Sequence, residues 1–157
     1  MPLQYVSGDA TAPQRPAPWM IAHVCNDLGR WGKGFVKPLA RRWPAAKREY
    51  LARARATGVA LGEVQFVALG EGRWVANMIG QRGVYRAGRK DAPIRYEALA
   101  RCLAQTSARA LELGASLHMP RIGAGLAGGD WAEIEALLRG QLALARLEVL
   151  VYTLPPG

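Results

Sequence analysis

The sequence predicts a three-layer α/β/α sandwich around a mixed, mostly parallel sheet of about six strands, in one domain over residues 1–157. Half of the 157 residues are hydrophobic, which is enough to form one core and argues against disorder. Short apolar runs alternate with longer amphipathic ones, as in a sheet covered by helices on both faces. Polar or glycine-rich segments follow three of the strands, at 8–9, 25–34 and 123–130. Because such sheets bind ligands beyond the carboxyl ends of their strands, we expect these segments to share one cleft.

The elements are expected in the order β-β-α-β-β-α-β-α-β. The predicted strands are 3–6, 19–24, 63–69, 74–79, 116–122 and 147–154, and the predicted helices are 35–56, 94–113 and 131–144. The Gly-Glu-Gly stretch at 70–72 is typical of a hairpin turn. Pro44 interrupts the first helix because it lacks the N–H of a helical hydrogen bond. Gly114 suits a C-cap, and Asp130 suits an N-cap with Glu133 completing a capping box.

The chain is strongly basic, with a net charge of +9, and arginine supplies 17 of its 21 basic residues. Arginine pairs well with phosphate, so the charge favours an anionic ligand or a polyanionic partner. The alternative is that most of these charges lie on solvated helix faces. No apolar run matches a membrane span and no signal-peptide pattern is present, so we expect a cytoplasmic protein without a membrane partner, most simply a monomer.

Two cysteines, Cys25 and Cys102, fit a reduced protein, and no spacing typical of a zinc site occurs, so no metal or other cofactor is expected. His23 and Cys25 are two residues apart in a predicted strand and share a face, which would suit an activated nucleophile. Because cysteine is among the most buried residue types and no third orienting group is evident, we interpret His23, Cys25 and His118 as structural rather than catalytic.

The most informative segment is 119–131, which contains four glycines between a strand and a helix. Bare backbone N–H groups and the helix N-terminus together make a site for phosphate or pyrophosphate. Alternatively, the glycines serve only a tight turn. Gly123, Gly125 and Gly128 formally match G-x-G-x-x-G, but only about thirty residues follow, too few for the remaining units of a dinucleotide-binding fold. No G-K-[ST] of a P-loop occurs anywhere in the chain.

Five segments, spaced over nearly the whole chain, together carry a resemblance to a known family. They are Ser7-Gly8-Asp9, His23-Val24-Cys25-Asn26-Asp27 through Gly32-Lys33-Gly34, Pro93 to Leu99, Met119 to Trp131, and Val151-Tyr152-Thr153-Leu154. In this combination the chain resembles a macrodomain, and more narrowly the branch of the human terminal ADP-ribose protein glycohydrolase and its bacterial relatives. The resemblance implies the macrodomain fold and ADP-ribose binding.

The resemblance also implies which residues contact ADP-ribose. The set is Asp9, Ala10, His23, Asn26, Gly32, Lys33, Gly34, Pro120, Ile122, Gly123, Ala124, Gly125, Leu126, Ala127, Gly128 and Tyr152. Asp9 would accept a hydrogen bond from the adenine amino group, and Tyr152 would border the adenine. The loop after the second strand would surround the distal ribose and diphosphate. The alternatives are an Asx-turn or helix cap at Asp9, a core or edge tyrosine at 152 and an ordinary Asn-Asp turn in that loop.

The resemblance fails at the family's catalytic pair. The human glycohydrolase uses a lysine nucleophile and an aspartate, where this chain has Gln81 and Ala127. Neither can perform that chemistry, so we expect a different mechanism that positions a water and relies on Asn26, Asp27 and Gln81. Asp27 would orient or deprotonate the water, and Gln81 would hold the distal ribose or the leaving group.

The expected activity is hydrolysis of mono-ADP-ribose from modified proteins, most simply at acidic side-chain esters, which need less leaving-group help than N-glycosides. Three alternatives stay open: an ADP-ribose reader without catalysis, a phosphatase of ADP-ribose 1″-phosphate, and a hydrolase of ADP-ribosylated nucleic acid. The last is suggested by the basic loop at 80–92, which carries Arg82, Arg86, Arg89 and Lys90. A solvated loop over the cleft is the simpler interpretation of that segment.

Overall fold

The computed structural model describes all of the chain except residues 1–2, 85, 88–90, 126, 143–145 and 156–157. Leu126 of the predicted ligand set, Arg89 and Lys90 of the basic loop, and the last turn of the helix predicted at 131–144 therefore lie outside the described residues. Within the described part, no helix is long and apolar enough to cross a membrane.

Six strands form one mixed sheet in the order β1-β6-β5-β2-β4-β3. Their bounds are Leu3–Ser7 (β1), Trp19–Asn26 (β2), Val64–Gly70 (β3), Arg73–Gln81 (β4), Ser116–Met119 (β5) and Val149–Thr153 (β6). Every neighbouring pair is parallel except the β3–β4 hairpin. The sheet prediction is therefore confirmed, and so is the turn at 70–72.

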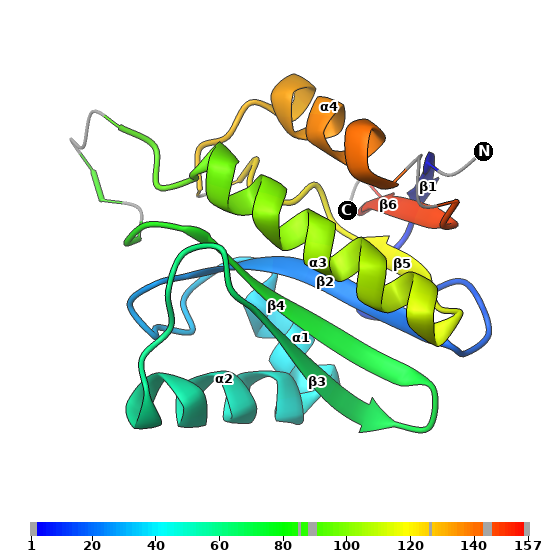
Figure 1. Ribbon diagram of the computed structural model, residues 1–157, viewed down its shortest axis with the longest axis horizontal. Coiled ribbons are helices and arrows are strands. Elements are labelled where there is room, and N and C mark those ends of the chain that lie inside the picture. Colours follow the sequence, from blue (N-terminus) through cyan, green and yellow to red (C-terminus); the bar gives the residue numbers. More distant parts are fainter. Residues whose placement is uncertain (1–2, 85, 88–90, 126, 143–145, 156–157) are drawn as a thin grey trace.

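Helices cover both faces of the sheet, as Figure 1 shows. They are Val36–Arg42 (α1), Pro44–Ala56 (α2), Tyr96–Leu113 (α3) and Trp131–Leu142 (α4). A hydrophobic cluster lies on each face of the sheet, because successive side chains of β2 point to opposite faces. Met20 packs in the cluster with Leu99 of α3, and Ile21 packs in the cluster with Leu39 of α1. The three-layer α/β/α architecture follows directly.

The local stop signals act largely as predicted. The helical stretch 35–56 is divided at Trp43-Pro44, with Pro44 in the first turn of α2, and Gly114 ends α3 in the left-handed conformation, with φ 64°. Asp130 Oδ1 accepts a hydrogen bond from Ala132 N at 3.0 Å and caps α4. In the predicted capping box the Glu133 side chain would accept from the Asp130 N–H. In the structure this N–H donates instead to the Tyr96 hydroxyl at 2.9 Å.

Several boundaries differ from the prediction: β2 continues to Asn26 and β4 to Gln81 instead of ending at 24 and 79, and two further differences shape the site. The fifth strand ends at Met119 rather than at 122, because Pro120 cannot donate to the sheet and Gly123 bends the chain with φ +71°. The helix predicted from 94 begins at Tyr96, since Ile94 instead forms an antiparallel bridge with Gln81. Both differences bring loop backbone to the carboxyl ends of β4 and β5.

Candidate ligand-binding cleft

Three adjoining pockets lie along the carboxyl ends of the parallel strands. The first, of about 650 Å³, lies against the segments that follow β1 and β6, and we call it the adenine-side pocket because it contains the residues predicted to contact adenine. The glycine-loop pocket, of about 180 Å³, lies beside residues 120–127, and the β2-loop pocket, of about 370 Å³, lies inside the loop that follows β2. Gly34, Phe35 and Arg121 are common to the first two, and Lys33 and Gln81 to the last two. The pockets therefore form one continuous cleft, as the strand-end segments predict.

Most of the predicted ligand residues line this cleft. They are Asp9, Ala10, His23, Asn26, Gly32, Lys33, Gly34, Pro120, Ile122, Gly123, Gly125, Ala127 and Tyr152. Ala124 and Gly128 lie in the same glycine loop but do not line these three pockets. The structure thus brings together residues from segments more than a hundred positions apart.

The glycines of the 123–129 loop fall into two kinds. A Cβ at Gly123 would lie 2.9 Å from Ile94 Cδ1, and one at Gly128 would lie 2.9 Å from Ala92 Cβ, with positive φ at both. These two serve the turn and its packing, as the tight-turn interpretation requires. Gly125 is different, since a Cβ there would meet nothing within 4 Å. Gly125 lines the pocket, so the absence of a side chain leaves room for a ligand to approach the backbone.

Asn26 organises the β2 loop from a buried position, with 6% of its surface exposed. Its Nδ2 donates to Arg30 O at 2.7 Å, and its Oδ1 accepts from Leu28 N at 3.0 Å and Arg30 N at 3.2 Å. The Tyr50 hydroxyl of α2 donates to Asn26 O at 2.7 Å. The side-chain amide is thus used inside the loop, as in the Asn-centred turn that was the alternative interpretation.

The other two predicted catalytic residues meet Asn26 where β2 and β4 end. Asp27 Oδ1 accepts from Gly83 N at 2.8 Å, and Asp27 N donates to Gln81 O at 3.0 Å. Gln81 Nε2 donates to Gly83 O at 2.9 Å, and its side chain lines two of the pockets. The sequence-predicted trio is therefore brought together. Within it, Gln81 reaches the cleft while Asp27 links the β2 loop to the segment after β4.

The adenine-side pocket has one carboxylate and one tyrosine. Asp9 is half-buried, and its Oδ1 accepts from both Thr11 N and Thr11 Oγ1 at 2.8 Å, which is an Asx-turn. Tyr152 is 3% exposed, and its hydroxyl accepts from Gln14 N at 2.8 Å and pairs with His118 Nδ1 at 2.8 Å. Burial raises the pKa of Tyr152. Both residues have the structural roles considered as alternatives and also face the pocket.

His23 lies on β2 at the floor of the glycine-loop pocket, 2% exposed. Asn77 Nδ2 donates to Ala46 O and Gln65 Oε1, so its Oδ1 faces His23 Nε2, 2.5 Å away. Nε2 therefore carries the proton, and Nδ1 is an acceptor that has no partner among the described residues. Burial lowers the pKa of His23 to about 4, so the ring is neutral at physiological pH.

Cys25 has the geometry of a structural thiol. Its Sγ lies 3.7 Å from His23 Nε2, but that nitrogen donates its proton to Asn77. Burial raises the pKa of Cys25 far above its usual range, so no thiolate forms near neutral pH. Within the described residues, no group of three His, Cys, Asp or Glu side chains is placed to hold a metal ion.

Sequence reasoning missed Arg121, which borders both the adenine-side and the glycine-loop pockets. Its guanidinium lies 5.2 Å from the ring centre of Tyr5 and 5.3 Å from that of Trp131. Two aromatic faces thus hold a cation beside the predicted phosphate position. The available signal was its place next to Pro120 at the start of the glycine loop. Its aromatic partners, far apart in sequence, could not be foreseen. The apolar walls formed by Trp31 and Phe35 were missed for the same reason.

Together, the sandwich and its glycine-lined cleft define an α/β/α domain that binds a ligand at the strand ends. The chain belongs to the macrodomain family, because the Macro domain family model matches residues 22–138.

Solved structures and a curated relative are similar to the chain over nearly its whole length. A macrodomain protein from Streptomyces coelicolor is 49% identical, with a TM-score of 0.83 over 96% of this chain and 98% of that one. A protein of unknown function from Bacteroides thetaiotaomicron is 42% identical, with a TM-score of 0.92 over 97% and 98% of the two chains. The mouse chromodomain-helicase-DNA-binding protein 1-like is 28% identical over 160 residues, which cover 98% of this chain. The chain spans 18% of the length of that relative.

Proposed function

We propose that the cleft binds ADP-ribose and that the protein hydrolyses mono-ADP-ribose from acidic side-chain esters of modified proteins. The observation that carries this proposal is the row of three connected pockets, whose middle member is lined by the open Gly125 and bordered by Lys33 and Arg121. An elongated ligand with its negative charge at the centre fits such a row. Macrodomain membership supports the same ligand.

The pockets suggest how the ligand is oriented. The adenosine occupies the adenine-side pocket, where Asp9 accepts from the amino group and Phe35 and Tyr152 supply apolar surface. The diphosphate lies over Gly125, beside the guanidinium of Arg121, which can donate two parallel hydrogen bonds to phosphate oxygens. The distal ribose enters the β2-loop pocket, between Trp31 and Gln81. The anomeric carbon then lies close to the trio at the ends of β2 and β4.

Hydrolysis in this site requires a positioned water rather than a covalent lysine intermediate. In the proposed step, Gln81 orients the water, its oxygen attacks the anomeric carbon, and the proton passes to Asp27. The bond to the ester oxygen breaks, and the carboxylate leaves with the bonding electron pair. A carboxylate leaves without protonation, so the missing family acid at Ala127 is not needed. Asn26 acts in this scheme as a positioning residue, since its amide holds the loop that carries Asp27.

The test follows the release of free ADP-ribose from a glutamate-modified protein by wild type, Gly125→Glu and Gly140→Glu. The first variant places a negative charge in the open phosphate position. The second makes the same change on α4, where a Cβ also meets nothing within 4 Å. Release by wild type and Gly140→Glu, but not by Gly125→Glu, supports the proposal. ADP-ribose binding without release would instead favour a reader or a phosphatase, and the 1″-phosphate would then be the next substrate. The same assay with an ADP-ribosylated oligonucleotide tests the nucleic-acid alternative.

A further inference from the structure

The positive charge of the chain is concentrated in one segment. Nine of the 21 lysines and arginines, but only one of the 12 acidic residues, lie between residues 30 and 56. This stretch contains the end of the β2 loop and the two helices α1 and α2. The rest of the chain is close to neutral, with 12 basic and 11 acidic residues. The net charge of +9 is therefore mainly a property of one face of the molecule.

A groove of about 530 Å³ runs along this face, and we call it the α1–α2 groove. Its basic side chains are Lys37, Arg41, Lys47 and Arg48, all exposed. The groove also contains aliphatic surface from Ala40, Pro44 and Leu51. It shares Trp31 and Gly32 with the β2-loop pocket and Arg41 with the adenine-side pocket, so it runs beside the cleft and adjoins the position proposed for the distal ribose.

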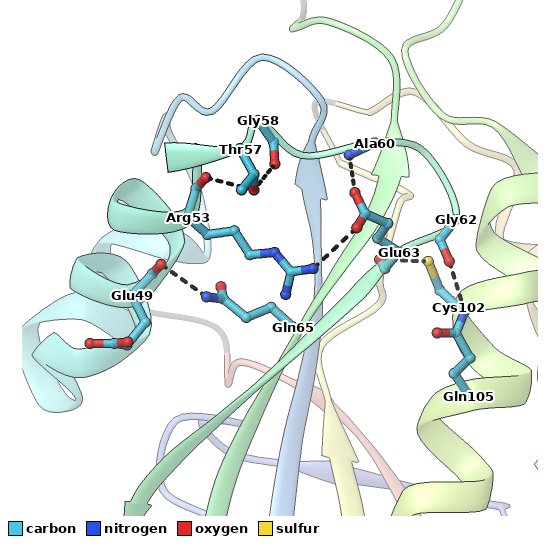
Figure 2. Close-up of polar contacts among 10 residues, drawn as sticks. All are labelled: Glu49, Arg53, Thr57, Gly58, Ala60, Gly62, Glu63, Gln65, Cys102 and Gln105. Carbon is cyan, nitrogen blue, oxygen red and sulfur yellow. Dashed lines mark hydrogen bonds and ion pairs between the residues drawn. The ribbon is translucent and has the colours of Figure 1, made fainter. Parts of the chain in front are cut away.

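Among the described residues, three of these four cations have no acidic partner, unlike Arg53 of α2. Arg53 of α2 pairs with Glu63 at 3.2 Å, in a network that joins α2 to β3 (Figure 2). In the part of the chain that the structure describes, Lys37, Arg41 and Lys47 have no acidic partner. Only Arg48 has one, in an exposed contact with its neighbour Glu49 at 3.5 Å. An electropositive groove with unpaired charges is suited to an anionic partner.

We propose that the α1–α2 groove binds an acidic polypeptide segment that flanks the modified side chain. This inference rests on the proposed function, because it places the acceptor protein where the distal ribose leaves the cleft. The side-chain carboxylates of this segment would contact the four cations, while its backbone and methylene groups would lie on the aliphatic surface. The groove thus selects acceptors by local charge, apart from the ADP-ribose itself.

The groove is less suited to single-stranded nucleic acid, which characteristically stacks its bases on free aromatic faces. The aromatic residue at this groove is Trp31, and its ring is already packed. It lies edge-on to His23 at 5.5 Å and tilted against Tyr50 at 5.6 Å, and its Nε1 donates to Val36 O. Aliphatic surface with a basic border favours a peptide.

The experiment compares two peptides that carry ADP-ribose at one position through a non-cleavable linkage. The acidic peptide has aspartate and glutamate on both sides of the modified position, and its neutral twin, the matched control peptide, has asparagine and glutamine there. Equilibrium binding is measured for wild type, the groove variant Lys37→Glu/Lys47→Glu, and the control Arg55→Glu/Arg73→Glu. The control changes the same net charge at exposed arginines outside the groove. Free ADP-ribose is titrated against all three proteins.

We expect wild type to bind the acidic peptide roughly tenfold more tightly than its twin at low salt. The preference should disappear in the groove variant and at about 0.5 M salt, and persist in the control. Affinity for free ADP-ribose should be unchanged in both variants. Equal binding of the two peptides by wild type, or equal loss in groove variant and control, would overturn the inference. So would a groove variant that loses affinity for an ADP-ribosylated single-stranded oligonucleotide but keeps the peptide preference. Failure of free ADP-ribose to bind would refute the proposed function, and the charge dependence of peptide binding would still decide this inference.

Discussion

Replacing Asn26 with alanine should loosen the loop that surrounds the proposed distal ribose. The change removes four side-chain hydrogen bonds, to Arg30 O at 2.7 Å, Leu28 N at 3.0 Å, Arg30 N at 3.2 Å and the Tyr50 hydroxyl at 3.1 Å, and that hydroxyl keeps its bond to the backbone Asn26 O. A neutral hydrogen bond contributes about 1 kcal/mol net, so the three bonds within the loop sum to about 3 kcal/mol. Leu28 and Arg30 are exposed, so water replaces part of the loss and we expect about 2 kcal/mol. For a chain of this length, that is a fall of about 4–8 °C in Tm.

The assay is urea unfolding of wild type, Asn26→Ala and Asn26→Asp, combined with titration of ADP-ribose. Aspartate keeps the Oδ1 acceptor for the two backbone N–H groups but cannot donate to Arg30 O, so its stability should be intermediate. Affinity for ADP-ribose should fall in the same order, because a loosened loop must become ordered when the ligand binds. If both variants unfold within about 0.5 kcal/mol of wild type, the loop does not depend on Asn26 and the reasoning is refuted.

Two further predictions concern the core and the glycine loop. Burial lowers the pKa of His23 to about 4 in the folded protein, from an ordinary value of 6.5, so the unfolded chain takes up the proton first. The contribution of neutral His23 to the free energy of unfolding is therefore fully present above pH 6.5. It is lost as the pH falls towards 4, and it amounts to on the order of 3 kcal/mol. Urea titrations between pH 7 and 4 should show this slope, and His23→Gln should flatten it in part, since His118 has the same lowered pKa; an unchanged slope would contradict the assignment. In the glycine loop, a Cβ at Gly129 would lie 2.5 Å from the Gly123 carbonyl oxygen, so Gly129→Ala should cost about 1–3 kcal/mol and weaken ADP-ribose binding. Gly125→Ala has open space and should unfold within about 0.5 kcal/mol of wild type; thermal melts that fail to separate the two variants would count against the division of the loop into two kinds of glycine.

The fold could be predicted because its signals are local. Pro44 divides α1 from α2, Gly114 ends α3, and the apolar run of β2 fits a strand covered on both faces. The glycine loop was predicted on the same basis. What the pattern did not show is that Gly123 and Gly128 serve packing whereas Gly125 is open, because that depends on Ile94 and Ala92 of a distant segment.

The parts of the site that escaped prediction depend on long-range contacts. Arg121 is held by Tyr5 and Trp131, which come together only because α4 lies next to β1, at the edge of the sheet. Asn26 was predicted to act on the ligand, but its side-chain hydrogen bonds are to its own loop and to Tyr50 of α2. Residue type indicated that this position matters, and only the structure could distinguish a contact with the ligand from support of the loop.

One helix links the two proposals. The inner face of α2 supports the cleft, because the buried Tyr50 donates to Asn26 O at 2.7 Å and packs against Trp31. Its outer face contributes Lys47 and Arg48 to the α1–α2 groove. A rigid helix thereby fixes the distance between the acidic segment of an acceptor and the loop that carries Asp27. An acceptor bound in the groove would present its ester to the water site at a set distance, and such orientation is a large source of catalysis where no strong acid or nucleophile is available. Selection by local charge and hydrolysis without a lysine would then follow from the same arrangement.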